Sequence, residues 1–174
     1  MLLWIIIIVA SILLDQITKI IVIETMNLGH SIVIWEDIFS FTRVHNYGAA
    51  WGMLSDHRWV FIVITAIAII VMPIFLYRYR KLHPLFGFSL SLVIGGAIGN
   101  MIDRLFRGYV IDFLDATFID FPVFNVADIC VVCGAIMMFV YILFFDKELF
   151  SGKDKKKAPK EVQKNADGTN EENH

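Results

Sequence analysis

The sequence predicts a mainly α-helical membrane protein with four transmembrane helices and a small β-sheet at the membrane surface. Of the 174 residues, 57% are hydrophobic, and the mean hydropathy is +0.67, whereas roughly 45–50% apolar residues are usual in soluble domains. A helix that crosses the hydrocarbon core of a bilayer needs about 20 mostly apolar residues. Four segments meet this requirement, at residues 2–23, 59–77, 85–102 and 126–145.

The first apolar segment is expected to remain in the protein as a transmembrane helix. It lacks the basic amino-terminal region of a signal peptide, and it carries Asp15 and Lys19 within the apolar stretch. A spacing of four residues places both side chains on one helical face. They can form a pair that neutralises itself, and we favour structural support over direct chemistry for both.

The basic residues predict the orientation of the chain. Arg78, Arg80 and Lys81 lie between the second and third apolar segments, and seven of the 15 Lys and Arg residues lie within 147–164. Short cytoplasmic loops carry an excess of such residues. We therefore expect both regions and both termini in the cytoplasm, and residues 24–58 and 103–125 outside. Residues 1–150 form one membrane domain in this interpretation, and the Lys-rich tail at 151–174 is expected to be disordered.

The first outer segment contains two stretches that favour β-structure. Residues 31–35 and 39–44 are short runs rich in β-branched and aromatic side chains. They predict a small sheet that lies on the membrane surface.

The unusual polar residues all fall near the outer membrane face on this topology. Asp15 and Lys19 lie in the outer half of the first helix. The other positions, in the outer segments or at the outer ends of the third and fourth helices, are Asn46, Asn100, Asp103, Arg104, Asp112, Asn125 and Asp128. Ionisable side chains within a membrane are costly and usually functional. Their gathering at one face predicts a site there.

Several of these polar residues also have a structural interpretation. Asn125, with Asp128 three residues later, is the pattern of a capping box at a helix start. Arg104 and Arg107 can extend toward lipid headgroups.

The small residues of the apolar segments favour packing over chemistry. Gly95, Gly96 and Gly99 suit close helix contact. Cys130 and Cys133 lie in an apolar run, and the sequence has no second Cys or His pair to complete a zinc site. We expect no metal and no cofactor.

Asp112 has the weakest structural explanation, because apolar residues flank it and no basic residue is adjacent. Two carboxylates that face one pocket share a proton, and one acts as acid while the other acts as base in aspartic proteases. Asp112 and Asp128 are therefore predicted to form a catalytic pair. Which of the two is the initial base stays open, because a coupled pair titrates as a unit.

Five sequence blocks resemble the lipoprotein signal peptidase (signal peptidase II) family. The blocks are DQITK at 15–19, NYGAAWG at 46–52, GGAIGNMIDR at 95–104, VIDF at 110–113 and FNVAD at 124–128. They occur in the order found in the family, and the four-span topology fits from end to end. One block alone would be weak, whereas the ordered set is highly specific. Only the Lys-rich tail lies outside the match.

The resemblance implies a four-helix membrane core with a small β-cradle and a short helix at the outer surface. It implies an aspartic endopeptidase of the bacterial cytoplasmic membrane, which cleaves prolipoproteins on the amino side of a diacylglyceryl-modified cysteine. Asp112 and Asp128 match the catalytic aspartates. The supporting positions are Asn46, Asn100, Asp103, Arg104, Asn125, Asp15 and Lys19. The sequence departs from the family at Tyr47, where smaller or polar residues are usual.

The expected partners are lipid-modified prolipoprotein signal peptides and membrane phospholipid. We expect a monomer and no nucleic-acid partner.

Two other functional classes fit part of the pattern. A proton- or ion-coupled transporter would use Asp15, Asp103 and Asp128 as a relay. The polar groups gather at one face, however, and the sequence has no evident inverted repeat. A structural or assembly protein with buried ion pairs is the other alternative, and it predicts that aspartate substitutions impair folding first.

Overall fold

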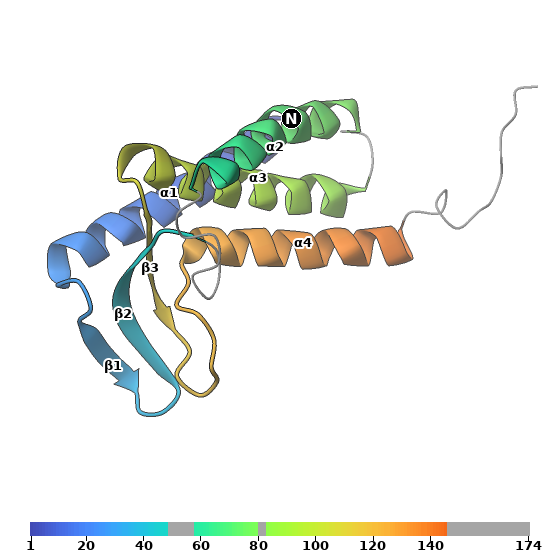
Figure 1. The fold of residues 1–174 in the computed structure, drawn as a ribbon. Helices are drawn as coiled ribbons and strands as arrows, with labels where there is room; N and C mark the ends of the chain where they lie inside the picture. The colour runs from blue at the N-terminus through green and yellow to red at the C-terminus, as the bar shows by residue number, and fades with distance from the viewer. Residues whose placement is uncertain (49–57, 80–82, 146–174) are drawn as a thin grey trace, which may run out of the picture.

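The computed structural model describes residues 1–48, 58–79 and 83–145. Four long helices and three strands make up the described chain (Figure 1). In chain order they are α1 (Leu2–Thr25), β1 (Ser31–Trp35), β2 (Phe39–Asn46), α2 (Arg58–Arg78), α3 (Pro84–Phe106), β3 (Val110–Asp115) and α4 (Val126–Phe144).

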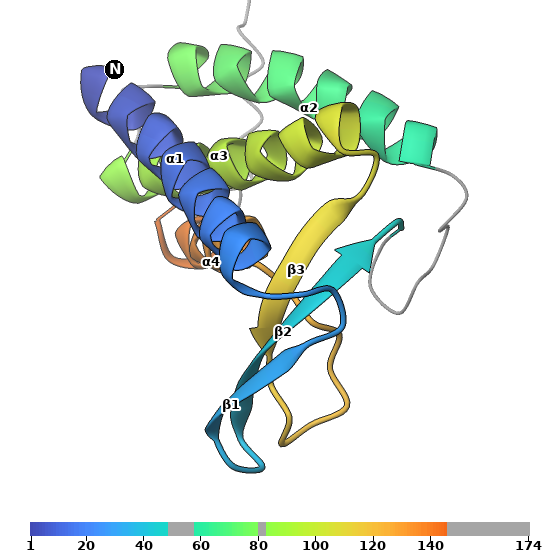
Figure 2. The same ribbon diagram turned by 90° about the vertical axis from the view of Figure 1, so that its left-hand side faces the viewer.

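All four helices are long and apolar enough to cross a membrane, which confirms the predicted fold class. Helix α3 is the central one, because it packs against each of the other three (Figure 2). In α3, 44% of the most apolar stretch is buried inside the protein, whereas in α2 the share is only 11%. Large apolar side chains such as Ile17, Ile64 and Phe139 are exposed. An apolar exterior of this kind is expected where lipid rather than water surrounds the helices.

Close contact between the helices depends on glycine. A Cβ on Gly95 would lie 2.6 Å from the Cβ of Ser11, and one on Gly99 would lie 2.6 Å from Asp15 Oδ2. Both glycines thus face α1 along one side of α3, while a Cβ on Gly96 would meet the backbone of α4. The predicted packing role of these glycines is confirmed.

The sheet is antiparallel with the order β1-β2-β3, and it projects from one end of the helix bundle (Figure 1). Strands β1 and β2 cover the two stretches that the sequence predicts. Strand β3 was not predicted: the segment that carries Asp112 was expected only as a connection between helices. Its backbone pairs with β2, and Val44 lies opposite Asp112. The pairing explains why this residue occupies a fixed position.

The third helix continues beyond the predicted end at residue 102 as far as Phe106. The short surface helix is absent from the described residues, and 49–57 are not among them, so it stays a prediction. The tail at 151–174, part of the NYGAAWG block and the basic positions Arg80 and Lys81 also lie outside the described residues.

Candidate active site

Asp112 and Asp128 line one cavity of about 310 Å³. Asp112 comes from β3, and Asp128 from the first turn of α4. Apolar walls are supplied by α2 and by the segment before α4, including Phe61 and Phe124. Residues that are 16 positions apart in the chain thus meet in one pocket, as the sequence predicts for a pair of acids.

Each of the two carboxylates accepts two hydrogen bonds from N–H groups. Asp112 Oδ2 accepts from Asn46 Nδ2 at 2.9 Å, and its Oδ1 accepts from Asn125 Nδ2 at 2.6 Å. Asp128 Oδ1 accepts from Asn100 Nδ2 at 2.8 Å, and its Oδ2 accepts from the backbone N–H of Asn125 at 3.0 Å. One residue, Asn125, therefore contacts both carboxylates.

The three asparagines are held so that each NH₂ group faces a carboxylate. The Oδ1 of Asn46 accepts from the backbone N–H two residues later at 2.9 Å. The Oδ1 of Asn125 accepts from the backbone N–H of Asp128 at 3.0 Å, and the Oδ1 of Asn100 accepts from Lys19 Nζ at 2.9 Å. An amide whose oxygen is engaged in this way has its donors aimed at the acids.

The predicted capping box at the start of α4 is present. Asn125 caps the helix, and the carboxylate of Asp128 returns a hydrogen bond to the backbone of Asn125. The capping interpretation of Asn125 and Asp128 is therefore confirmed, and the same geometry also leaves Asp128 at the cavity.

Burial separates the two acids. The side chain of Asp112 is 2% exposed, whereas Asp128 is partly exposed. Burial, and next the nearby charge of Asp128, raise the pKa of Asp112 from 3.8 to about 6. The amides of Asn46 and Asn125 oppose this rise. Asp112 is thus the member of the pair that more readily keeps a proton.

A second pair of acids lies beside the first and is held by a cation. Lys19 Nζ is 2.9 Å from Asp15 Oδ2, 2.9 Å from Asp103 Oδ2 and 2.9 Å from Asn100 Oδ1. The side chains of Lys19, Asp15 and Asp103 are all 0% exposed. The three donors of the ammonium group therefore each have an acceptor, as a charge buried in a protein requires.

The buried acids also bind the backbone of the elements that carry the first pair. Asp15 Oδ1 accepts from the N–H of Ala127 in α4 at 3.0 Å. Asp103 Oδ2 accepts from the N–H of Ile111 in β3 at 3.2 Å. This cluster connects α1, α3, β3 and α4 at the level of the cavity.

Gln16 and Arg107 complete the cluster, and the sequence interpretation assigned neither to the site. Gln16 Nε2 donates to Asp15 Oδ2 at 3.0 Å and to the carbonyl of Gly99 at 3.1 Å. Arg107 donates to Gln16 Oε1 at 3.3 Å and forms an ion pair with Asp103. An amide between two apolar stretches of the first helix was the signal that could have identified Gln16.

Arg104 lines the wall of the cavity that Asp112 and Asp128 share. Its guanidinium donates to the carbonyl of Gly48 at 3.2 Å and lies 5.1 Å from the centre of the Phe61 ring. Tyr47 is exposed, and its ring lies 5.5 Å from that of Tyr109. Among the described residues, the N–H groups that donate to the two acids come from Asn46, Asn100 and Asn125 and not from Tyr47.

The cysteines lie away from this cavity. Cys130 and Cys133 are free thiols on α4, and neither lines the cavity. Within residues 1–48, 58–79 and 83–145, no group of three or more His, Cys, Asp or Glu is placed to hold a metal.

The chain is similar to known peptidases over most of its length. The family described as signal peptidase (SPase) II matches residues 7–144. A lipoprotein signal peptidase of Brevibacillus brevis is 49% identical over 121 residues, which cover 70% of this chain and 81% of the relative. One from Geobacillus kaustophilus is 44% identical over 138 residues, covering 78% and 90%.

The fold is also similar to solved structures. One, described as a bacterial membrane enzyme structure, has a TM-score of 0.75 and 35% identity, and the match covers 88% of this chain and 93% of the other. A second of the same description has a TM-score of 0.72 and 35% identity, covering 82% and 93%.

Proposed function

Because the chain belongs to the signal peptidase II family, we propose that Asp112 and Asp128 are its catalytic pair. The protein is a membrane peptidase that removes signal peptides from prolipoproteins. The observation that carries the assignment is the double contact of Asn125, which donates to Asp112 at 2.6 Å and to Asp128 at 3.0 Å. Two acids within reach of one residue meet the requirement of an aspartic protease.

The environments of the two acids support different roles. Asp112 is buried and its pKa is raised to about 6, so it starts as the protonated acid. Asp128 is partly exposed at the N-terminus of α4. With Asp112 as the acid of the pair, Asp128 takes the role of the initial base.

Hydrolysis then follows from one shared proton. Asp128 takes a proton from water as the water oxygen bonds to the scissile carbonyl carbon, and Asp112 donates its proton to the carbonyl oxygen. The tetrahedral diol breaks its C–N bond when Asp128 passes its proton to the leaving nitrogen. Asp112 recovers a proton from a hydroxyl of the diol, so the pair returns to its initial state.

The remaining polar groups of the cavity act on substrate and acids. Asn46, Asn100 and Asn125 keep the two carboxylates in place, and Arg104 supplies a positive charge at the cavity wall. A second layer of support comes from Lys19, which donates to Asn100. Asp15 and Asp103 add to it, because they accept hydrogen bonds from the backbone of α4 and β3.

The substrate is a diacylglyceryl-modified prolipoprotein, cut on the amino side of the modified cysteine. The apolar walls of the cavity and the lipid-facing exterior of the helices support a substrate that remains in the membrane. The acids lie at the end of the bundle that carries the sheet. We place this end outside, with both termini in the cytoplasm of a bacterial cell, on the basis of the basic residues near 78–81 and 147–164. One chain supplies both acids, which supports a monomer.

The test of the catalytic pair is to replace each acid by its amide. Asp112→Asn and Asp128→Asn should each lower the cleavage rate of a lipidated precursor peptide by at least about 10²–10⁴-fold, the range for loss of acid–base catalysis. A gel shift of the precursor measures cleavage in detergent.

Asp115→Asn is the matched control for this test. Asp115 lies in the same strand as Asp112, but it accepts a hydrogen bond from Thr42 at 2.6 Å and does not line the cavity. Its amide variant should cleave at close to the parent rate. Near-normal cleavage by either variant of the catalytic pair would show that the assignment is wrong.

A further inference from the structure

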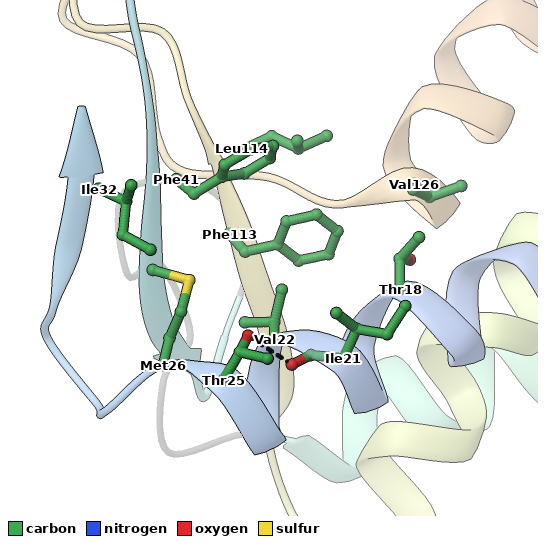
Figure 3. Close-up of a pocket in the computed structure, with 10 residues that line it drawn as sticks. All are labelled: Thr18, Ile21, Val22, Thr25, Met26, Ile32, Phe41, Phe113, Leu114 and Val126. Atoms are coloured by element: carbon green, nitrogen blue, oxygen red, sulfur yellow. Dashed lines mark hydrogen bonds between the residues drawn. The ribbon is translucent and has the colours of Figure 1, made fainter. Parts of the chain in front are cut away.

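A second cavity lies beside β3, and we propose that it binds one acyl chain of a phosphate-bearing membrane lipid. The cavity has a volume of about 450 Å³ and opens between α1, the sheet and the start of α4 (Figure 3). Its walls include Ile21 and Val22 of α1, Phe41 of β2, Phe113 of β3 and Val126 of α4. It shares no lining residue with the catalytic cavity.

The two cavities are lined by different residues of the same part of the chain. In β3, Asp112 lines the first cavity, whereas Phe113 and Leu114 line the second. Phe124, before α4, lines the first, and Val126, in the first turn of α4, lines the second.

The walls of the second cavity suit hydrocarbon. Its two threonines, Thr18 and Thr25, donate their hydroxyl protons to carbonyls of α1 itself, at 2.8 Å to Asp15 and 2.7 Å to Ile21. No side-chain donor of the wall is then left for a polar ligand, whereas a peptide would bring unsatisfied backbone groups with it. The volume falls in the range of about 300–1,000 Å³ that small-molecule sites have.

The position of the cavity favours a chain that comes from the bilayer. Helix α1 is apolar enough to span a membrane, and Ile21, on the cavity wall, is 54% exposed. The cavity thus borders the surface that lipid covers. It is at the carboxyl end of α1, where the chain leaves the helix for the sheet.

Arg43, beside the cavity, is the cation that would bind the phosphate of the lipid headgroup. Arg43 Nη1 donates to the carbonyls of Ile23 and Met26, at 3.1 and 2.7 Å, and the side chain of Met26 lines the cavity. The Nε of Arg43 is buried without a hydrogen-bond partner, and no carboxylate of the described residues forms an ion pair with this guanidinium. A phosphate is the anion that arginine binds best at a membrane surface.

An acyl chain in this position would brace the strand that carries Asp112. The chain would pack against Phe113, whose side chain belongs to the core cluster with Val22, Met26 and Ile111. A lipid that binds only the folded protein raises its stability by mass action. The occupant is a bilayer glycerophospholipid rather than the substrate, since this cavity shares no lining residue with the catalytic one.

The test is a titration of delipidated protein in detergent with phosphatidylglycerol, followed by native mass spectrometry. One lipid should bind saturably and raise the Tm. Ile21→Trp, which fills the cavity, should weaken binding at least tenfold, while Ile20→Trp should leave it unchanged. Ile20 is the matched control because it is 49% exposed on the same helix and does not line the cavity. Elution as a single species, with a Tm close to that of the parent without lipid, verifies that both variants fold.

Two further arms identify the headgroup and the position. Arg43→Gln should weaken phosphatidylglycerol at least tenfold but leave diacylglycerol, which has the same chains and no phosphate, unchanged. A phosphatidylglycerol with a photoreactive group near the end of one chain should label the peptide that contains Phe113.

Three results would overturn the proposal. The first is uptake that does not saturate or that both tryptophan variants reduce equally, because this is the behaviour of lipid that merely surrounds the helices. The second is labelling confined to α2 or the far half of α4. The third is displacement of the bound lipid by a lipidated precursor peptide, which would assign the cavity to the substrate.

Discussion

Two pairs of aspartates lie side by side in this protein, and they differ in whether a cation forms an ion pair with them. Asp15 and Asp103 each lie 2.9 Å from the ammonium group of Lys19. Asp112 and Asp128 receive only amide and backbone N–H groups, and neither forms an ion pair with a described residue. The same side chain is thus placed in two electrostatic settings.

The difference explains how a fold makes one pair structural and the other reactive. A cation between two carboxylates offsets part of their mutual repulsion and gives each of them a charged hydrogen-bond partner. Amide donors orient a carboxylate without cancelling its charge, so two acids held in this way keep one proton between them. Acid–base chemistry needs that proton. The two pairs are also connected, because Lys19 binds Asn100 and Asn100 binds Asp128.

Removal of the cation from the structural pair should have the largest effect. Lys19→Met leaves two buried carboxylates without their shared partner, and breaking a buried ion pair costs about 3–5 kcal/mol. The oxygen of Asn100 then keeps only the amide of Asn125, which donates to it at 3.1 Å, so the side chain of Asn100 is held less firmly against Asp128. We expect a large loss of thermal stability in detergent and a cleavage rate below the limit of a gel assay.

A double variant separates charge from position. Lys19→Met with Asp15→Asn restores neutrality, because Asp103 remains paired with Arg107. Stability should return in part, while cleavage should stay low since Asn100 still lacks the bond from Lys19. Full recovery of cleavage would mean that Lys19 acts only through charge balance and does not orient Asn100.

Addition of a cation to the reactive pair tests the comparison from the other side. In Asn46→Lys an ammonium group replaces the amide that lies 2.9 Å from Asp112 Oδ2. It should hold Asp112 ionised and remove the shared proton, with a fall in kcat of about 10²-fold or more. Asn46→Met, of similar length and without charge, is the matched control and should fall less. If both variants lose the same activity, the charge at this position is irrelevant.

The sequence predicts the elements of this comparison better than its connections. Apolar length alone predicts the helices, and the spacing of Asp15 and Lys19 predicts their pairing on one face. The Asn125 and Asp128 pattern predicts the capping box, which the structure contains. These features depend on residues within a few positions of each other, so a local pattern carries them.

Contacts between distant segments could not be read in the same way. Strand β3 was missed, because an apolar run with an acid at its centre lacks the alternation of a typical half-buried strand. The VIDF block at 110–113 was recognised in the sequence, but its pairing with β2 was not. The bond between Lys19 and Asn100 joins positions 81 residues apart, and no periodicity encodes it. For the same reason Gln16 was left unassigned, and Arg107 was interpreted as extending toward lipid headgroups although it pairs with Asp103.

The pH dependence sharpens the contrast within the reactive pair. Because the pKa of Asp112 is raised from 3.8 to about 6, the folded protein binds more protons than the unfolded chain between these values. Stability should therefore fall as pH rises through this window, by about 3 kcal/mol for a shift of this size. A chemical denaturation series in detergent from pH 4 to pH 7 measures it, and Asp112→Asn should flatten the trend.

Activity should respond to the same proton. If protonated Asp112 is the acid, kcat/KM falls tenfold per pH unit above about 6, since this parameter reports the free enzyme. A profile that stays level to pH 8 would contradict the assignment of Asp112 as the acid. It would not contradict the proposal that Asp112 and Asp128 form the catalytic pair.

The smallest expected effect concerns the second cation of the structural pair. Arg107 forms an ion pair with Asp103, but its side chain is 24% exposed, whereas Lys19 is 0% exposed. Water screens the partly exposed guanidinium, so Arg107→Gln should cost only about 1 kcal/mol of stability, and Asp103 keeps Lys19 as its partner. Cleavage should stay within a few-fold of the parent, because Asn100 is still held by Lys19. Asp103 loses its partner Arg107 in this variant and its partner Lys19 in Lys19→Met. Equal losses of stability in the two variants would mean that burial does not distinguish the two cations.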